Sequence, residues 1–379
     1  MRWVRNLSEP APKTVSRFAP ARPAAARMLL AVTAAFLAWS LMSVPACMLS
    51  APVSSDPRQF DVSIYKEVVE RVHGGESYYD ALGTALRSRG RATRSVLNWR
   101  TPLQLGLLGW LPSLMWGVLL LGAGATLALF FGSCIMSRVG SASNMLAPVQ
   151  LFLMVGPLAG CFGSDGVFFA ELWAGTAIAI SVGAYAFDHR RTGLGAGLVA
   201  LFLRELALPY VLVCVFLAWR AKRRRELLGW AAGLAGYALY FGLHAAAVHS
   251  RLGPAEVANP VGWAQFGGLS FVLRASSVGW LLALPAWATA VYVPLALVGL
   301  AGWRHRAAER VGMTVGTYMA VYAIFGFPFS TYWGALYAPL LSFGAAMSPI
   351  AVRDLLRAAS AAAKTGNVPA ATATGRAGC

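Results

Sequence analysis

The sequence predicts an all-α integral membrane protein with about eight transmembrane helices and one re-entrant helix pair. Hydrophobic residues make up 58% of the 379 residues, whereas charged residues make up only 12%. Because a soluble domain with so few charges cannot cover its surface with polar groups, a polytopic membrane protein is expected. A chain of this length holds about eight to ten spans of roughly 20 residues each and leaves no separate soluble domain.

The apolar runs divide the chain into three parts. A basic cytoplasmic tail at 1–26 precedes a polytopic membrane domain at 27–352, and a cytoplasmic tail without regular structure is expected at 353–379. The N-terminus resembles a signal peptide with an overlong basic region, but its apolar run is full length, which favours an uncleaved first span. The predicted spans are residues 27–49, 113–136, 145–161, 169–187, 228–248, 278–301, 312–327 and 335–352.

The re-entrant pair is predicted at 193–219, where an apolar segment has basic clusters at both ends. A single crossing would place one cluster on the wrong side of the membrane, whereas two short helices that enter and return keep both inside. The kink is expected around Arg204, Glu205 and Pro209. Such irregular backbone at membrane depth must be packed in protein or line a wet cavity.

The charge distribution gives the expected orientation. Of the 32 Lys and Arg residues, 21 fall in segments that lie inside if the N-terminus is inside. The positive-inside rule therefore predicts a multi-pass protein of the bacterial inner membrane with both termini cytoplasmic. The same distribution, in short loops between apolar runs, argues against nucleic acid as a partner despite the net charge of +17.

The first of two large periplasmic loops, at 50–112, gathers scarce carboxylates; the second covers 249–277. The stretch 60–82, FDVSIYKEVVERVHGGESYYDAL, holds five of the 15 acidic residues. Apolar residues at every fourth position from Phe60 predict a surface helix that the Gly pair at 74–75 ends. Within it, Asp61 and Tyr65 lie one turn apart, and Glu67 and Glu70 are expected to be solvated.

The next outside connection, at 160–175, carries two further acids. Asp165 lies in a Gly- and Ser-rich turn, and Glu171 lies at the start of a predicted span. Since a carboxylate at a membrane boundary is expensive to desolvate, Glu171 is a functional candidate. The alternative is that it only fixes the end of the helix.

Taken together, these segments resemble the GT-C glycosyltransferases, polytopic enzymes that take a sugar from a polyprenyl-phosphate carrier. The first-loop stretch, with its Asp soon after the first span and its Gly-x-x-Tyr-Tyr end, resembles their first outside loop. The closest resemblance is to the bacterial branch of polyprenol-phosphate-mannose-dependent transferases. TYWGALYAPLL at 331–341 resembles the aromatic and Pro segment of that family. A third match covers Glu171, Asp188, Arg190, Arg191, Gly195, Gly197, Arg204 and Pro209.

The resemblance covers most of the chain in layout and implies an inverting hexosyltransferase. It implies that Asp61 is the general base that takes the proton of an acceptor hydroxyl, with Glu171 and Asp165 as further catalytic candidates. The leaving phosphate then needs cations. The candidates are Arg100 (first in preference), Arg204, Arg251 and Arg274. The candidates for sugar or acceptor contact are Tyr65, Tyr78, Tyr79 and Trp99, although an interfacial aromatic belt also explains such residues.

Several partners and cofactors follow from the same resemblance. The donor is a polyprenyl-phosphate-linked sugar, and the acceptor is a glycan, glycolipid or protein. Some family members use a divalent metal, Mg²⁺ or Mn²⁺, and others rely on Arg or Lys, so metal dependence stays open. Because ArgGluLeuAlaLeuPro stands where that branch often has Lys-Pro, the sugar also stays open.

Other basic residues are expected to have structural roles. Arg87, Arg89, Arg91 and Arg94 are expected to form a solvated basic face. Asp188 is expected to pair with the neighbouring arginines of an inside loop.

Two other functions are compatible with the sequence. A transporter or flippase of a lipid-linked or small anionic substrate is favoured by the Gly- and Pro-interrupted helices and by the intramembrane Arg204–Glu205 pair. The lack of a repeat between the two halves argues against it. The third alternative is a structural partner that anchors an envelope complex.

Overall fold

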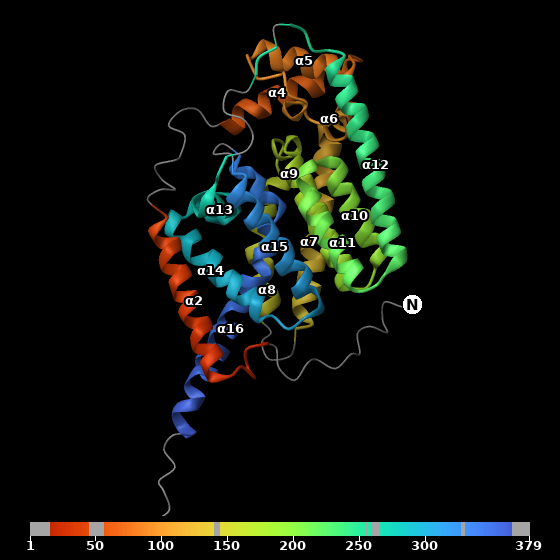
Figure 1. The fold of residues 1–379 in the computed structure, drawn as a ribbon. Helices are drawn as coiled ribbons and strands as arrows, with labels where there is room; N and C mark the ends of the chain where they lie inside the picture. The colour runs from red at the N-terminus through yellow and green to blue at the C-terminus, as the bar shows by residue number, and fades with distance from the viewer. Residues whose placement is uncertain are drawn as a thin grey trace, which may run out of the picture.

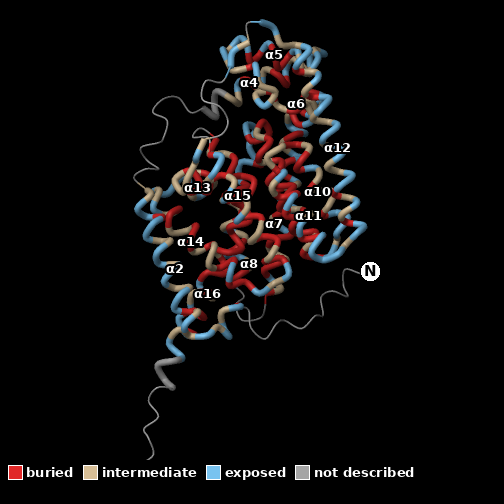
Figure 2. Tube along the Cα trace, in the orientation of Figure 1, coloured by how far each residue is buried: buried red, intermediate tan, exposed pale blue. Residues whose placement is uncertain are grey.

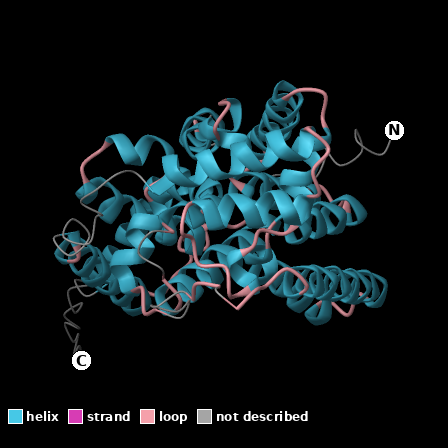
Figure 3. Cartoon of the chain, turned by 90° about the horizontal axis from the view of Figure 1, so that it is seen from above, coloured by secondary structure: helices cyan, strands magenta, loops and turns pink. Residues whose placement is uncertain are grey.

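The computed structural model describes residues 16–44, 57–139, 145–254, 256–258, 265–326 and 330–365. In these ranges the chain is helical, and the extended structure is limited to one isolated bridge between Ser16 and Trp303 (Figure 3). The all-α prediction is therefore confirmed for the described residues.

The described residues form the following α-helices in chain order. Their bounds are α2 Pro23–Met42, α4 Pro57–His73, α5 Tyr78–Ser88, α6 Pro102–Trp110, α7 Leu114–Ser137, α8 Leu146–Leu158, α9 Ala170–Ala186, α10 Arg190–Leu203, α11 Leu208–Arg220, α12 Arg224–His249, α13 Gly268–Ser276, α14 Ala286–Gly302, α15 Arg306–Ile324 and α16 Ala338–Thr365. The 3₁₀ helices are η1 Val96–Asn98, η2 Ala159–Phe162, η3 Gly166–Phe168, η4 Glu205–Ala207, η5 Gly279–Ala283 and η6 Thr331–Leu336.

Three of the described helices are long and apolar enough to cross a membrane, namely α2, α7 and α12. They expose large apolar side chains such as Trp39 on α2, Leu120 on α7 and Leu239 on α12. Extended apolar surface of this kind is unusual on a soluble protein and suits contact with lipid. Two shorter apolar helices lie at Leu146–Phe162 and Ala286–Gly302. The count of eight spans stays a prediction.

The helix bounds differ from the predicted spans in three places. The span predicted at 278–301 is divided, because η5 and the N-cap residue Pro285 precede α14. The span predicted at 312–327 begins earlier, at Arg306, where the His305 side chain accepts a hydrogen bond from the backbone N–H of Ala307. The tail predicted to lack regular structure at 353–379 is helical as far as Thr365, because α16 continues through it.

Helices α4, α5 and α6, with η1, form a layer across one end of the bundle, here named the cap (residues 57–110) (Figure 1). The predicted helix α4 is present, but its apolar stripe is buried against α5 and α6 rather than turned to a membrane surface, with Ile64 2% and Val68 0% exposed. It ends at His73, and Gly75 then adopts φ +92°, which favours glycine. The helix that follows, α5, has an N-cap at Ser77, whose hydroxyl accepts from the Asp80 amide.

The bundle below the cap has its most buried residues along α9, α15 and the first half of α16 (Figure 2). Helices α10 and α11 follow α9 as an antiparallel pair. The loops at the outer ends of this pair, around Arg190 and Arg220, line one common cavity, so the chain returns to the end of the bundle from which α10 began. Between the two helices, the chain is interrupted by η4 as expected, and Pro209 lies in the first turn of α11.

Candidate functional site

Glu171 lies in the first turn of α9, where the cap meets the bundle, and its side chain is completely buried. Two arginines from distant parts of the chain reach the same carboxylate oxygen. Nη1 of Arg100 lies 3.1 Å from Oε1, and Nε of Arg204 lies 2.8 Å from it. Nη1 of Arg204 also lies 2.5 Å from Oε1 of Glu205. These four residues are named the Glu171 cluster.

The local chain conformation explains why these side chains meet. Arg100 lies in the extended stretch between η1 and α6, directly before Thr101, the N-cap of α6. Arg204 lies at the break between α10 and η4, with φ −153° and ψ 121°. A helix that ran straight through residue 204 would keep its side chain on the helix surface, so the break allows Arg204 to turn toward α9.

Two tyrosines of the cap hold Arg100 in place. Nε of Arg100 donates to the hydroxyl of Tyr65 at 2.9 Å, and the guanidinium lies 5.3 Å from the centre of the same ring. The hydroxyl of Tyr78 donates to the carbonyl oxygen of Arg100 at 2.7 Å. Burial raises the pKa of both tyrosines above the ordinary value, so each hydroxyl keeps its proton at neutral pH.

Asp61, the predicted base, lies beside the cluster rather than inside it. Its Oδ1 accepts from Nη2 of Arg91 at 2.6 Å. Burial raises the pKa of this carboxyl above its ordinary value of 3.8, and the charges of Arg91, Arg100 and Arg204 lower it in part. The charge of Glu171 raises it as well. The charges of three cluster residues, Arg100, Glu171 and Arg204, therefore act on Asp61.

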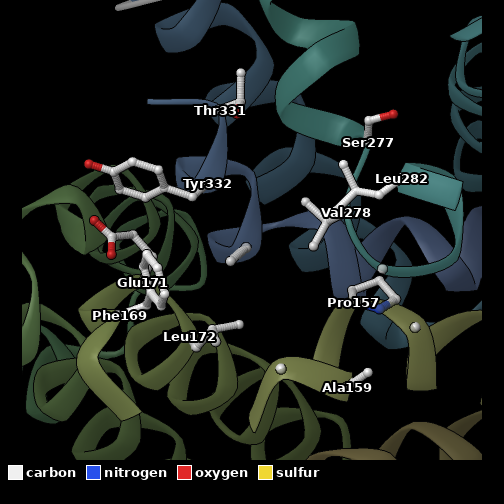
Figure 4. A pocket seen from close by; sticks show the side chains of 14 residues that line it. Pro157, Ala159, Phe169, Glu171, Leu172, Ser277, Val278, Leu282, Thr331 and Tyr332 are labelled. Carbon is white, nitrogen blue, oxygen red and sulfur yellow. The ribbon is translucent and has the colours of Figure 1, made fainter. Parts of the chain in front are cut away.

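A cavity of about 230 Å³ lies against Glu171, and we name it the Glu171 cavity. Figure 4 shows Glu171 and Tyr332 together on one side of it and Pro157, Val278 and Leu282 on the other. The cavity is thus polar at one wall and mainly apolar elsewhere. Its lining residues come from α8, η2, α9, η5 and η6.

Two glycines allow the close approach of the walls. A Cβ at Gly175 would lie 2.1 Å from the carbonyl oxygen of Ala335, so glycine lets η6 pack against α9 and places Tyr332 near Glu171. Gly279 has φ +67°, and a Cβ there would lie 2.0 Å from the backbone carbon of Gly156. Larger residues at either position would separate the elements that form the cavity.

Two buried atoms of the cluster have no hydrogen-bond partner among the described residues, Nε of Arg204, which lies only at ion-pair distance from Glu171, and Oε2 of Glu171. Oε2 of Glu171 is buried and has no hydrogen-bond donor among the residues that the structure describes. A buried carboxylate oxygen without a donor is costly, and a ligand hydroxyl would remove this cost. Because Glu171 lines the cavity, a ligand there is within reach of the carboxylate.

Five of the predicted site residues come together here. Asp61, Tyr65, Arg100, Glu171 and Arg204 are connected by the contacts and charges described above. Tyr78 supports the backbone of Arg100. The preference for Arg100 among the candidate cations agrees with its position against Glu171.

The structure places other predicted residues elsewhere, in the cap and in the chain after α12. Trp99 is 3% exposed, donates from Nε1 to the carbonyl of Thr93 at 2.8 Å and packs in the core of the cap. Arg251 pairs with Asp80 at 2.8 Å and lies over the ring of Tyr79. Burial raises the pKa of Tyr79 to about 12.

Asp165 and Arg274 lie on elements that do not contribute to the Glu171 cluster. Asp165 is an exposed residue directly before η3. Arg274 lies in the last turn of α13.

The expectation of a solvated basic face in the cap is wrong for three of its four arginines, whereas Arg94 is exposed as expected. Arg87 pairs with Glu256 at 2.7 Å, Arg91 pairs with Asp61, and Arg89 pairs with Glu67. For the same reason Glu67 is not merely solvated: the hydrogen bond from Arg89 holds its pKa below the ordinary value. The acids of α4 and the arginines at 87–91 have opposite charges, which indicates that they could pair. Which of them pair depends on how α4 packs on α5.

Two residues of the site were not predicted from the sequence as part of it. Arg91 contacts the predicted base, and Tyr332 lies beside Glu171 on the same wall of the cavity (Figure 4). The Arg204–Glu205 pair was already noted in the sequence, and the structure forms it. Asp188 does pair with Arg190, at 2.9 Å, as predicted.

The described residues do not offer a carboxylate set for a metal ion. Asp61, Glu171 and Glu205 each have an arginine within ion-pair distance. Within the described ranges no group of three or more His, Cys, Asp or Glu side chains is placed to hold a metal. Since each of these carboxylates is already paired with an arginine, the site is a poor set of ligands for Mg²⁺ or Mn²⁺.

Comparisons with protein-family models, curated proteins and solved structures give no match for this chain.

Proposed function

We propose that the protein is a membrane glycosyltransferase that moves a sugar from a polyprenyl-phosphate carrier to an acceptor hydroxyl on the periplasmic side. The observation that supports this most is the juxtaposition of Asp61 with two buried arginines next to a cavity that is largely apolar. Sugar transfer from a lipid phosphate needs a base, cations for the phosphate and an apolar surface for the lipid.

Asp61 acts as the general base in this proposal. The acceptor hydroxyl attacks the anomeric carbon as its proton passes to the Asp61 carboxylate. The new bond joins the acceptor oxygen to the anomeric carbon, and the bond between that carbon and the phosphate oxygen breaks. The electron pair of the broken bond stays on the phosphate, and inversion follows from attack on the face opposite to the leaving group.

The leaving phosphate gains negative charge, and Arg100 and Arg204 lie where they neutralise it. Both guanidiniums are already oriented by Glu171, so little reorganisation is needed during the reaction. Glu171 is therefore assigned a positioning role for the two arginines. Its Oε2, which has no donor among the described residues, accepts a hydrogen bond from a hydroxyl of the donor sugar.

The carrier lipid occupies the apolar side of the Glu171 cavity, beside Val278 and Leu282. In this arrangement the cap lies at the periplasmic interface, the α10–α11 pair is re-entrant from the cytoplasmic face, and the eight predicted spans surround it. Both termini are then cytoplasmic, in agreement with the positive-inside rule. The acceptor is a glycan, glycolipid or protein.

Replacement of Asp61 by Asn tests the proposal. We expect turnover of a polyprenyl-phosphate sugar to fall by roughly 10²–10⁴-fold, the usual contribution of a general base, while binding of the donor is retained. Glu70→Gln, an exposed acid on the same helix, is the matched control. Unchanged turnover of the purified protein after Asp61→Asn would show that Asp61 is not the general base.

A transporter or flippase of an anionic lipid-linked substrate is the second candidate. It is favoured by the break between α10 and η4, which places Arg204 and its two carboxylate partners at an interrupted helix. In that case Asp61→Asn leaves activity intact, whereas Arg204→Gln abolishes movement of the labelled lipid between leaflets of proteoliposomes. Glycan profiles of a deletion strain then stay unchanged while solute or lipid transport changes.

A further inference from the structure

A second cavity, of about 380 Å³, lies at the opposite end of the bundle from the cap, where the α11–α12 turn is seen in Figure 1. Its walls come from the end of α9, the α9–α10 loop, the α11–α12 turn and the first turns of α15. We name it the Arg310 cavity. Its charged lining residues are Asp188, Arg190, Arg220, Arg223, Arg306, Glu309 and Arg310.

The lining carries more arginines than carboxylates. Arg190 pairs with Asp188 at 2.9 Å, and Arg220 pairs with Glu309. Arg223 lies 3.5 Å from Glu226, a residue behind the wall. No carboxylate of the described residues lies within ion-pair distance of Arg306 or Arg310. Two cations that face the cavity thus have no ion-pair partner in the described part of the chain.

Arg310 is held in place although it lacks a carboxylate at that distance. It is only 7% exposed, and its guanidinium lies 3.7 Å from the centre of the Tyr185 ring. Nη1 donates to the sulfur of Cys214 at 2.8 Å. The buried carboxylate of Glu226 adds a favourable charge interaction without reaching ion-pair distance. A thiol and an aromatic ring compensate the remaining cost of a buried cation poorly, so an anion in the cavity would stabilise this side chain further.

The positive-inside rule explains basic loops at this end in general, but it requires only that arginines lie near the membrane surface. Burial of Arg310, and the convergence of arginines from three separate segments on one hollow, go beyond that requirement. Phosphate is the anion that arginines bind best, because its oxygens accept several N–H bonds from planar guanidiniums. Basic pockets between membrane helices bind phospholipid head groups in this way.

We propose that the Arg310 cavity binds a phosphate group, either on an anionic lipid head group or on a soluble phosphate compound. Arg310 and Arg306 are the principal contacts, and Arg190 and Arg220 are drawn from their present carboxylate partners as the phosphate enters. The inference does not rest on the proposed sugar transfer, since the cavity lies at the other end of the bundle from the Glu171 cluster.

Binding to the full chain in detergent tests the proposal, with phosphatidylglycerol, phosphatidylcholine and inorganic phosphate as separate probes. Thermal shift and native mass spectrometry provide the affinities. We expect Arg306→Gln and Arg310→Gln each to weaken phosphate-dependent binding by roughly tenfold or more, as loss of one charged hydrogen bond implies. Arg191→Gln removes the same charge at the same end but does not line the cavity, so it should bind as the unaltered protein does.

The probes distinguish the source of the phosphate. Preferential binding of phosphatidylglycerol over phosphatidylcholine, lost in Arg306→Gln and Arg310→Gln, supports a lipid head group. Binding of inorganic phosphate with the same losses and without lipid preference supports a soluble phosphate. The proposal would be overturned if all variants bound the three probes as the unaltered protein does. It would also be overturned if Arg191→Gln weakened binding as much as Arg306→Gln and Arg310→Gln do. Arg306 is exposed, so Arg306→Gln keeps the test valid if Arg310→Gln does not fold.

Discussion

Nη1 of Arg100 lies 3.1 Å from Oε1 of Glu171 although the two residues are 71 positions apart in the sequence. Arg100 belongs to the cap and Glu171 begins α9, so this ion pair connects the outer layer to the bundle. Both partners are almost fully buried, which makes the pair sensitive to the loss of either side. The first prediction follows from this sensitivity.

Glu171→Gln should destabilise the protein by about 3–5 kcal/mol, the range for breaking a buried ion pair, because two arginines lose their common carboxylate. Thermal unfolding in detergent measures the effect. The control is Asp188→Asn, which breaks an exposed pair with Arg190 and whose φ of 63° asparagine tolerates. We expect the control to change stability by less than about 0.5 kcal/mol. Equal effects of the two replacements would contradict the buried-pair interpretation.

Arg91→Gln should move the acid limb of the pH–rate profile to higher pH. Burial raises the pKa of Asp61 above 3.8, and the charge of Arg91 opposes that rise. Removal of Arg91 therefore raises the pKa further, and the base becomes protonated, and inactive, at a higher pH than before. The profile of kcat/KM against pH measures the shift. Arg89→Gln, whose partner is Glu67, is the control and should leave the limb in place.

Tyr65→Phe should raise the KM for the polyprenyl-phosphate donor without unfolding the protein. The ring stays under the Arg100 guanidinium, but the hydrogen bond from Nε at 2.9 Å is lost, at a cost of about 1–2 kcal/mol. Arg100 is then less well oriented toward the phosphate, and KM for the donor should rise by roughly tenfold. Tyr79→Phe removes a hydroxyl that contacts His244, so it should leave the KM unchanged. A larger effect in the control would place the donor near α12 instead.

Gly175→Ala should separate α9 from η6, because the added Cβ would lie 2.1 Å from the carbonyl oxygen of Ala335. Displacement of η6 moves Tyr332 away from Glu171, so both thermal stability and turnover should fall. The control is Gly195→Ala in α10, where nothing lies within 4 Å of the new Cβ. There the higher helix propensity of alanine should stabilise by about 0.5–1 kcal/mol. Normal stability after Gly175→Ala would show that η6 can move without cost.

The surface helix α4 shows how far local patterns reach. Apolar residues at every fourth position and the Gly pair at 74–75 predicted both its existence and its end, since these features act within one turn. The sequence did not predict that Arg89 and Arg91 pair with Glu67 and Asp61. That pairing depends on the packing of α5 and its following loop against α4.

The site residues also fall into two groups, those that the sequence indicated and those that only the packing of the helices brings to the site. Asp61, Arg100, Glu171 and Arg204 were candidates because their charges are unusual next to apolar segments, and burial of a charge is expensive wherever it occurs. Glu205 carries the same signal as part of the Arg204–Glu205 pair, whereas the uncharged Tyr332 does not. Tyr332 becomes part of the site only because Gly175 lets η6 approach α9, and the break after Leu203 lets Arg204 turn toward Glu171.

By itself, the sequence determined the helical class, the approximate positions of the helices and the short list of charged residues worth attention. These properties follow from composition and from periodicity over a few turns, which neighbouring residues in the chain fix. The tertiary structure alone decided which charges meet. Arg100 and Arg204 both reach Oε1 of Glu171. Arg306 and Arg310 face a cavity and have no carboxylate at ion-pair distance in the described ranges. Both arrangements arise because helices distant in sequence pack side by side.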